Sequence, residues 1–276
     1  MKNTIIDFLV QFIISSLKLF SRTTRRKIIF YIAAKSLKLT HKTRKMAINN
    51  ISNAMPWLNE EEVAQIVLSS YQTIAFGVME CFWLTDIKFK ISCDDKTRRL
   101  LDSAGVSIAT MHMSCYELAP FSIQQLTGSV ATLSNIPTFI RSIKEVYRAA
   151  NIKAIDKNQP HAFIDLLQAA RDKHAICLHV DHYKSDVAVS FFNRKTMAPS
   201  GSAMLSSYSK APLLLCYPIL EKNGDYTLYI ETISEKPVGS SKNEISLAMQ
   251  KIYQRLETII LEYPNQWYWS YNRWRD

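Results

Sequence analysis

Glycine and cysteine are both scarce in this chain. Only six of its 276 residues are glycine, which argues against collagen-like, linker-rich and glycine-loop proteins. The five cysteines are odd in number and form no Cys-x-x-Cys pair. We therefore expect reduced, mostly buried thiols in a cytosolic compartment rather than a disulfide framework. The sequence also contains no internal repeat and no low-complexity tract, so an ordinary folded domain is the expected class.

The apolar run near the N-terminus is short for a transmembrane helix. Residues 5–20 are mostly apolar, but Asp7, Gln11 and Lys18 interrupt them, whereas a spanning helix needs about 20 apolar residues. We expect an N-terminal helical membrane anchor that docks on the bilayer surface. A marginal spanning helix and an ordinary amphipathic core helix are the alternatives.

Positive charge is in excess, with a net charge of +10 and a pI near 9.3. This balance favours anionic partners, namely nucleic acid, acidic lipid surfaces or acidic carrier proteins. Basic residues are concentrated in the first 45 positions and interleave with apolar ones, as on a helix that lies on a membrane surface. If the first helix spans, this basic cluster stays on the cytoplasmic side. No nucleic-acid-binding motif is recognisable, so we do not expect a nucleic-acid partner.

The first part of the chain is predicted to be helical, over 3–20, 23–39 and 41–54. Pro56 ends this region, and Asn59 followed by Glu62 resembles a capping box that opens a helix to about Trp83. We therefore divide the chain into an N-terminal membrane-associating region, 1–56, and one domain, 57–276.

Strands and helices alternate in the rest of the chain. Apolar residues make up 47% of the sequence, enough for a substantial core. Strands are predicted over 106–111, 130–134, 152–155, 175–180, 187–192, 213–220 and 226–233, and helices over 115–126, 138–150, 160–173, 200–210 and 243–262. The residues 222–225 between the last two strands suit a hairpin turn. The expected fold is α/β, a mixed and mostly parallel sheet flanked by helices.

The strongest chemical signal is His112 with Glu117, separated by four residues. His112 directly follows a predicted buried strand, and ligands of open α/β sheets bind beyond the carboxyl ends of the strands. We expect the Glu117 carboxylate to accept the N–H of one ring nitrogen. The other nitrogen then removes a proton from a hydroxyl that attacks a carbonyl. Free N–H groups of the following helix are candidate donors to the oxyanion.

Neighbouring residues suggest alternatives to this chemistry. Ser114 or Cys115 beside His112 would allow a covalent acyl-enzyme, as in a thioesterase or lipid hydrolase. The missing G-x-S-x-G elbow argues against a hydrolase of the common α/β type. The cluster of His179, Asp181 and His182 could suggest a metal site, but no further residues have familiar ligand spacing, so we expect no metal and no cofactor.

Four stretches together resemble the bacterial lipid A late acyltransferases, the lauroyl and myristoyl transferases, within the lysophospholipid acyltransferase-like superfamily. They lie in the same order and at similar spacing from about residue 40 to the end. The stretches are NNISNAMP at 49–56, His112 to Glu117, VSFFNRKTMAPSG at 189–201, and PNQWYW at 264–269 with Asn-Arg-Trp at 272–274.

The resemblance implies a glycerolipid-acyltransferase-like fold and transfer of an acyl group from acyl carrier protein or acyl-CoA to a hydroxyl of a lipid or glycolipid. It implies catalysis by His112 and Glu117, and substrate contacts by Arg148, Asp181 and Arg194. It also places the protein on the cytoplasmic face of a bacterial inner membrane. A membrane-lipid-binding protein without activity on the same scaffold is a further alternative.

The chain differs from the family pattern at several positions. Asn193 and Lys195 replace a glycine and a proline in the "FFGRP" element. Val180 and His182 replace the proline and glutamine around the aspartate that Asp181 matches. These positions are expected near the acceptor or the acyl chain, so the sequence does not fix the acceptor. The aromatic C-terminus, from Trp267 to Trp274, should either pack against the domain or form an interfacial belt.

Overall fold

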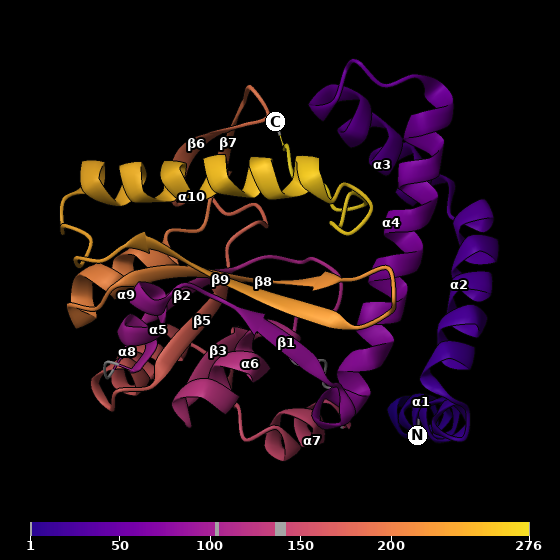
Figure 1. Ribbon diagram of the computed structural model, residues 1–276, viewed down its shortest axis with the longest axis horizontal. Helices are drawn as coiled ribbons and strands as arrows, with labels where there is room; N and C mark the ends of the chain where they lie inside the picture. The colour runs from indigo at the N-terminus through magenta and orange to yellow at the C-terminus, as the bar shows by residue number, and fades with distance from the viewer. Residues whose placement is uncertain (1, 103–104, 136–141, 276) are drawn as a thin grey trace.

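The computed structural model describes residues 2–102, 105–135 and 142–275. Four helices come first: α1 (Lys2–Lys18), α2 (Arg22–Leu39), α3 (His41–Ala54) and α4 (Glu60–Glu80). They stand beside the sheet rather than on it, with α2 and α3 packed against α4 (Figure 1). A 3₁₀-helix, η1 (Cys81–Asp86), leads from α4 into the rest of the chain.

The start of α4 confirms the predicted capping box. The Asn59 side chain accepts a hydrogen bond from the Glu62 N–H at 3.0 Å, and the Glu62 carboxylate accepts one from the Asn59 N–H at 2.8 Å. These two bonds satisfy N–H groups that no helical carbonyl reaches. The far end of α4 is tied to α2, because Arg22 Nε donates to Glu80 Oε1 at 2.6 Å and Arg22 Nη2 donates to Glu80 Oε2 at 2.8 Å.

A mixed sheet forms the centre of the molecule and confirms the predicted α/β class. Within the described residues its seven strands lie in the order β1-β9-β8-β2-β5-β3-β4, and all neighbours are parallel except β8 and β9. The bounds are β1 (Phe89–Ser92), β2 (Ser107–Thr110), β3 (Val130–Ser134), β4 (Lys153–Asp156), β5 (Ala175–His179), β8 (Leu213–Leu220) and β9 (Tyr226–Ser234). A separate antiparallel pair joins β6 (Val187–Phe191) to β7 (Arg194–Ala198).

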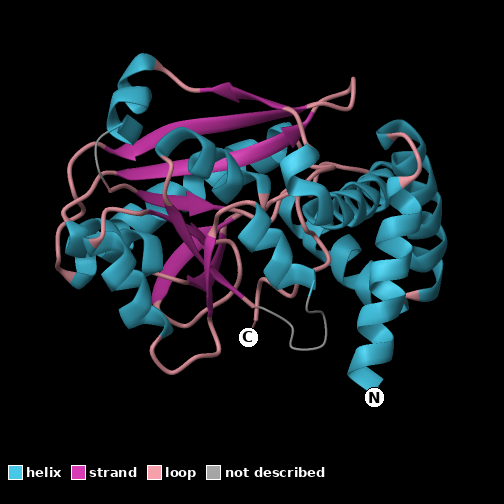
Figure 2. Cartoon of the chain, turned by 90° about the horizontal axis from the view of Figure 1, so that it is seen from below, coloured by secondary structure: helices cyan, strands magenta, loops and turns pink. Residues whose placement is uncertain are grey.

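Helices cover both faces of this sheet (Figure 2). They are α5 (Asp95–Asp102), α6 (Leu118–Thr127), α7 (Ser142–Ala149), α8 (Ala162–Arg171), α9 (Gly201–Ser209) and α10 (Lys242–Glu262). The fully buried strand β8 shows how the sheet separates two cores. Leu213 and Leu215 pack in the core under α10, while Leu214 and Cys216 pack in the core that contains α6. This alternation is the two-residue period of a strand that is buried on both sides.

Three elements of the structure were not predicted: β1, α5 and β7. Strand β1 is only four residues long and pairs with β9 at the edge of the sheet. Strand β7 is rich in polar residues, and it follows β6 after a tight turn in which Phe192 and Asn193 both have positive φ angles, 52° and 57°. That turn sits where the family pattern has glycine, a residue that adopts positive φ without strain.

None of the helices in the described part of the chain combines the length and apolar character that crossing a bilayer requires. Exposed apolar side chains nevertheless gather on the first helix and its exit, at Phe8, Leu9, Phe12, Ile13, Leu19 and Phe20.

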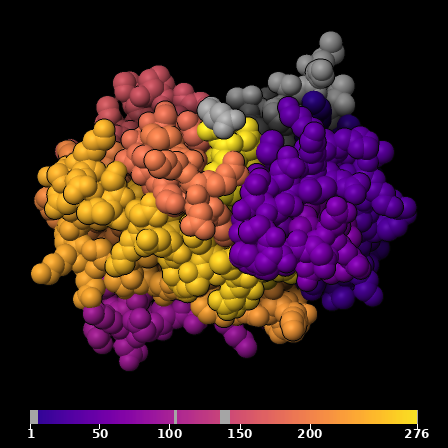
Figure 3. Space-filling view, turned by 90° about the horizontal axis from the view of Figure 1, so that it is seen from above, coloured from indigo at the N-terminus to yellow at the C-terminus, as the bar shows by residue number. Residues whose placement is uncertain are grey.

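The aromatic C-terminus packs against the domain, which is the first of the two predicted alternatives. Trp267, Trp269 and Trp274 are buried. The Arg273 side chain is fully buried, and its guanidinium donates hydrogen bonds to the Thr196 and Tyr253 hydroxyls. On the face shown in Figure 3 the yellow C-terminal segment lies directly against the purple N-terminal helices.

Candidate active site

His112 follows the central strand β2, at the carboxyl end of the sheet. Strand β2 lies between β8 and β5, so His112 lies at a crevice of the kind in which α/β sheets bind ligands. The C-terminal segment supports this loop through backbone hydrogen bonds. The Tyr268 N–H donates to the His112 carbonyl at 3.2 Å, and the Ser114 N–H donates to the Gln266 carbonyl at 2.9 Å. These two hydrogen bonds hold the backbone at His112 and at Ser114, two residues later.

Asp181 holds the His112 ring. Its Oδ1 lies 2.8 Å from His112 Nδ1, and its Oδ2 accepts the His112 backbone N–H at 3.0 Å. Asp181 comes just after β5, which pairs with β2, so the register of the two strands brings the two residues together. Trp267 Nε1 donates to the same Oδ2 at 2.9 Å. Trp267 was not predicted to belong to the site, although it lies within one of the family-like stretches.

The Asp181 carboxylate is only 1% exposed. Burial raises its pKa, but the charge of His112 and its hydrogen bond outweigh burial, so the pKa of Asp181 lies well below its ordinary value. An ionised Asp181 accepts the hydrogen of Nδ1. The tautomer that leaves Nε2 of His112 with a free lone pair is therefore favoured.

The ring contact expected from Glu117 is made instead by Asp181. Glu117 lies at the start of α6, and its Oε1 accepts a hydrogen bond from the Tyr147 hydroxyl at 2.8 Å. Its Oε2 is shut off from solvent and has no hydrogen-bond partner among the described residues. The pKa of Glu117 is raised above its ordinary value, because the effect of burial outweighs the Tyr147 hydrogen bond and the charge of His112, which both lower it. Glu117 and His112 thus interact through their charges, and within the described residues no hydrogen bond joins their side chains.

The helix start after His112 does not offer the expected free donors at its first positions. The Leu118 N–H donates to the Cys115 carbonyl at 2.9 Å, and the Ala119 N–H donates to the Tyr116 carbonyl at 3.1 Å. These two turn hydrogen bonds occupy N–H groups that were candidates for an oxyanion site.

His112 and Glu117 both line a cavity of about 700 Å³. Its wall includes residues of helices α8 and α9, the ends of β3 and β5, and the loop after β5. Apolar lining residues are Leu133, Phe163, Leu166, Leu178, Val180, Pro199 and Met204. Histidines at the sheet end contribute as well, since His179 and His182 belong to the lining. A polar catalytic end joined to an apolar wall suits a ligand with a reactive carbonyl and a hydrocarbon chain.

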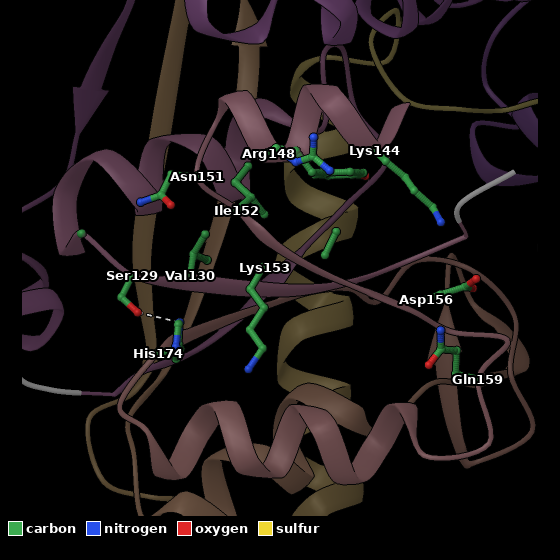
Figure 4. Close-up of a pocket in the computed structure, with 13 residues that line it drawn as sticks. Ser129, Val130, Lys144, Arg148, Asn151, Ile152, Lys153, Asp156, Gln159 and His174 are labelled. Carbon is green, nitrogen blue, oxygen red and sulfur yellow. Dashed lines mark hydrogen bonds between the residues drawn. The ribbon is translucent and has the colours of Figure 1, made fainter. Parts of the chain in front are cut away.

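Arg148 lies away from this cavity. It projects from α7 into a second hollow of about 540 Å³, which is lined by α7, the start of β3, the edge strand β4 and residues beside them (Figure 4). Its side chain is 76% exposed and pairs with Glu145 on the same helix at 2.8 Å. Lys144 lines the same hollow, and Arg141, which precedes α7 in the sequence, lies outside the described residues. The structure therefore does not bring Arg148 together with His112.

Arg194 is also apart from the catalytic cavity. It begins β7, and its guanidinium lies over the Trp274 ring, 4.9 Å from the ring centroid. This is a cation–π contact that holds the end of the chain against the β6–β7 pair.

Ser114 and Cys115 are unsuited to serve as nucleophiles. Both are fully buried, and Ser114 Oγ donates to Gln266 Oε1 at 2.6 Å. Burial, together with Cys81 at a sulfur–sulfur distance of 3.8 Å, raises the pKa of the Cys115 thiol well above its ordinary value. A buried, protonated thiol is inert, so the arrangement does not support a covalent acyl-enzyme.

The side chains of His179, Asp181 and His182 do not surround a common point at which a metal ion could bind. Both oxygens of Asp181 contact His112, and His179 Nδ1 lies 2.7 Å from Thr110 Oγ1. Within the described residues no group of three or more histidine, cysteine, aspartate or glutamate side chains is placed to hold a metal ion.

Similarity to known proteins is found at the level of the family. A family model described as bacterial lipid A biosynthesis acyltransferase matches residues 1–276. Among curated proteins, none matches the chain. Among solved structures, the chain is similar to the 1-acyl-sn-glycerophosphate (LPA) acyltransferase PlsC from Thermotoga maritima. The identity is 13% and the TM-score 0.42, and the match covers 93% of this chain and 100% of that one. That similarity is too distant to bear on the site. The match to the family model extends over the full chain, and the protein belongs to the bacterial lipid A biosynthesis acyltransferase family.

Proposed function

We propose that the protein transfers a fatty acyl group from a thioester, carried by acyl carrier protein or coenzyme A, to a hydroxyl of a lipid or glycolipid related to lipid A precursors. The observation that carries this proposal is the pair of His112 and Asp181, 2.8 Å apart, at the end of a cavity with an apolar wall. Membership of the family supports acyl transfer to a lipid.

His112 is the general base of the proposed reaction. Its Nε2 takes the proton of the acceptor hydroxyl as that oxygen attacks the thioester carbonyl. A carbon–oxygen bond forms, and collapse of the tetrahedral intermediate breaks the carbon–sulfur bond. The thiolate leaves and takes the proton back from the imidazolium. The Asp181 carboxylate fixes the ring and stabilises the imidazolium between the two proton transfers.

Glu117 supports the same step through its charge. Its carboxylate lies at the wall of the same cavity and interacts electrostatically with His112. In the ionised form it adds to the negative potential that Asp181 provides when the imidazolium forms. Its second oxygen, Oε2, is buried and has no hydrogen-bond partner among the described residues.

The acceptor is a membrane lipid in this proposal, so the protein should dock on a bilayer. Helix α1 exposes Phe8, Leu9, Phe12 and Ile13. Lys18 at the end of α1 and Lys27 on α2 are exposed as well. Apolar side chains that enter the headgroup region, together with exposed lysines, favour an anionic membrane surface. We place this surface on the cytoplasmic face of a bacterial inner membrane.

Product analysis tests the proposed activity. Purified protein is incubated with lauroyl-acyl carrier protein or lauroyl-CoA and a total bacterial lipid extract, and the lipids are analysed by mass spectrometry. Transfer predicts a lipid that has gained one lauroyl group and that is absent with His112→Ala protein. Release of free laurate in the presence of the extract would instead indicate a hydrolase, and lipid binding without turnover would indicate a non-catalytic protein. The rate with each donor distinguishes the carrier protein from coenzyme A.

A further inference from the structure

The catalytic imidazole is the first of three stacked aromatic rings, followed by His182 and Tyr271. The His112 and His182 ring centroids lie 3.8 Å apart, and their planes differ by only 4°. His182 in turn stacks on Tyr271, with centroids 3.8 Å apart and an angle of 11° between the planes. His182 stands where the family pattern has glutamine, which has no ring.

The outer ring of the stack is firmly attached. The Tyr271 hydroxyl accepts hydrogen bonds from the Tyr183 N–H at 3.3 Å and from Arg275 Nη2 at 3.1 Å. The Tyr271 carbonyl accepts a hydrogen bond from the buried Asn50 side chain at 3.0 Å. Tyr271 is thus tied to the loop after β5, to the C-terminus and to α3, and it gives His182 a fixed surface.

His182 contacts His112 and Tyr271 through the two faces of its ring. Its Nε2 is shut off from solvent and has no hydrogen-bond partner among the described residues. Burial, followed by the charge of His112, lowers the pKa of His182 to about 4. The ring is therefore neutral near pH 7, and it does not repel a neighbouring imidazolium as a second cation would.

A hydrogen bond at Nδ1 alone leaves the plane of His112 free to tilt, because the torsion that rotates an imidazole about its Cβ–Cγ bond has broad minima. A second contact, on the face of the ring, removes that freedom. We propose that His182, backed by Tyr271, is a positioning residue that holds the plane of the His112 ring and keeps its Nε2 turned toward the cavity. The kinetic part of this inference rests on the proposed acyl transfer, whereas the geometric part does not.

Two substitutions at position 182 distinguish the effect of a flat ring face from the effect of apolar volume. His182→Phe keeps a flat aromatic face, and His182→Leu keeps apolar volume but loses the face. Tyr271→Leu removes the support of the stack and provides a second variant should His182→Leu fail to fold, which thermal melting reports. His161→Leu is the matched control, because His161 is exposed and does not line the catalytic cavity.

The first readout is the tautomer of His112, measured by two-bond ¹H–¹⁵N correlation spectra of protein labelled at histidine, with His112→Ala protein to assign the signals. At a pH where the ring is neutral, wild type, His182→Phe and His161→Leu should show a single tautomer with the hydrogen on Nδ1. His182→Leu and Tyr271→Leu should show averaging between the two tautomers, because a ring that tilts away from Asp181 loses the hydrogen bond that selects one of them. An unaltered single form in both leucine variants would overturn the proposal.

The second readout is steady-state transfer from lauroyl-acyl carrier protein to the total lipid extract. The kcat of His182→Leu should fall about tenfold or more with little change in KM, because misorientation affects the reacting geometry and not binding. His182→Phe should restore most of the lost kcat. Equal losses in the phenylalanine and leucine variants, or no loss in either, would refute a role for the ring face. If wild-type protein transfers no acyl group, the proposed function fails, and the tautomer measurement still decides whether His182 positions His112.

Discussion

Gly77 on α4 lies directly against the backbone of Ser114, two residues after His112. A Cβ on Gly77 would lie 2.1 Å from the Ser114 carbonyl oxygen and 2.6 Å from the Cys115 nitrogen. Both distances are shorter than a Cβ atom approaches an atom to which it is not bonded. Ser114 has a φ angle of 49°, in the left-handed region that non-glycine residues seldom adopt. Helix α4 therefore supports the loop that carries His112 through direct backbone contact.

Replacing Gly77 by alanine should damage both the fold and the activity. Alanine in a helix interior normally stabilises a protein by about 1 kcal/mol relative to glycine. Here the added methyl group must displace the loop, and overpacking of this kind costs about 1–3 kcal/mol. We expect Gly77→Ala to lower the free energy of unfolding in urea titrations and to lower kcat at temperatures where the variant is folded.

The matched control for Gly77 is Ala64→Gly on the exposed side of the same helix. It should cost about 1 kcal/mol through helix propensity alone and leave transfer unchanged. If Gly77→Ala protein proved more stable than wild type, the close contact with Ser114 would not exist.

Much of the fold was predictable because its signals are local in the sequence. The apolar run of β2 and the Asn59–Glu62 capping box each depend on a few consecutive residues, and both are confirmed by the structure. Strand β1 was missed because its four residues alternate between half-buried and exposed at the edge of the sheet. Its place in the sheet is set by β9, more than 130 residues later, a distance that no local pattern reports.

Trp267 should matter for catalysis through its indole N–H. That group donates to Asp181 Oδ2 at 2.9 Å, so Trp267→Phe leaves the buried carboxylate with one donor fewer. A lost hydrogen bond to a charged group costs about 1.5–3 kcal/mol. We expect a fall in kcat of about tenfold or more, measured by transfer from lauroyl-acyl carrier protein. Trp269→Phe is the control, because the Trp269 indole donates to the Pro264 carbonyl instead. Equal effects of the two substitutions would argue against a specific role for Trp267.

Arg22 should be important for stability, since it pairs with a Glu80 side chain that is 3% exposed. Removing one partner of a buried ion pair costs about 3–5 kcal/mol, because the other charge is left unpaired. We expect Arg22→Met to destabilise the protein by that order in urea titrations and Arg22→Met/Glu80→Leu to recover much of the loss. Lys18→Met, which breaks the exposed pair with Asp86, should cost about 1 kcal/mol or less. A cost for Arg22→Met as small as that of Lys18→Met would show that the pair is not buried in solution.

Glu117 should make the stability of the protein depend on pH. Burial raises the pKa of Glu117 in the folded state, so the folded state binds this proton more tightly than the unfolded state. The resulting stabilisation is present below the ordinary pKa and is lost as pH rises through the raised one. The melting temperature of Glu117→Gln relative to wild type should therefore be higher at pH 8 than at pH 5. A difference between Glu117→Gln and wild type that does not change with pH would contradict a raised pKa.

The candidate site was only partly predictable. His112 and Asp181 follow neighbouring parallel strands, and the sequence indicated both as site residues. The four residues between His112 and Glu117, however, led to the prediction that Glu117 is the partner of the ring. The pairing of β2 with β5, which brings Asp181 to His112, is a long-range contact that spacing does not reveal. Tyr147, which donates to Glu117, gave no signal at all, because a tyrosine on a helix resembles any core residue.

The general-base role of His112 is tested most directly by its removal, with acylated lipid measured by mass spectrometry after incubation with lauroyl-acyl carrier protein and the total lipid extract. His112→Ala protein that melts like wild type should lose at least about 10³-fold in transfer rate, and Asp181→Asn should lose a comparable factor because the favoured ring tautomer changes. Transfer at a near-normal rate by folded His112→Ala protein would contradict the proposed mechanism.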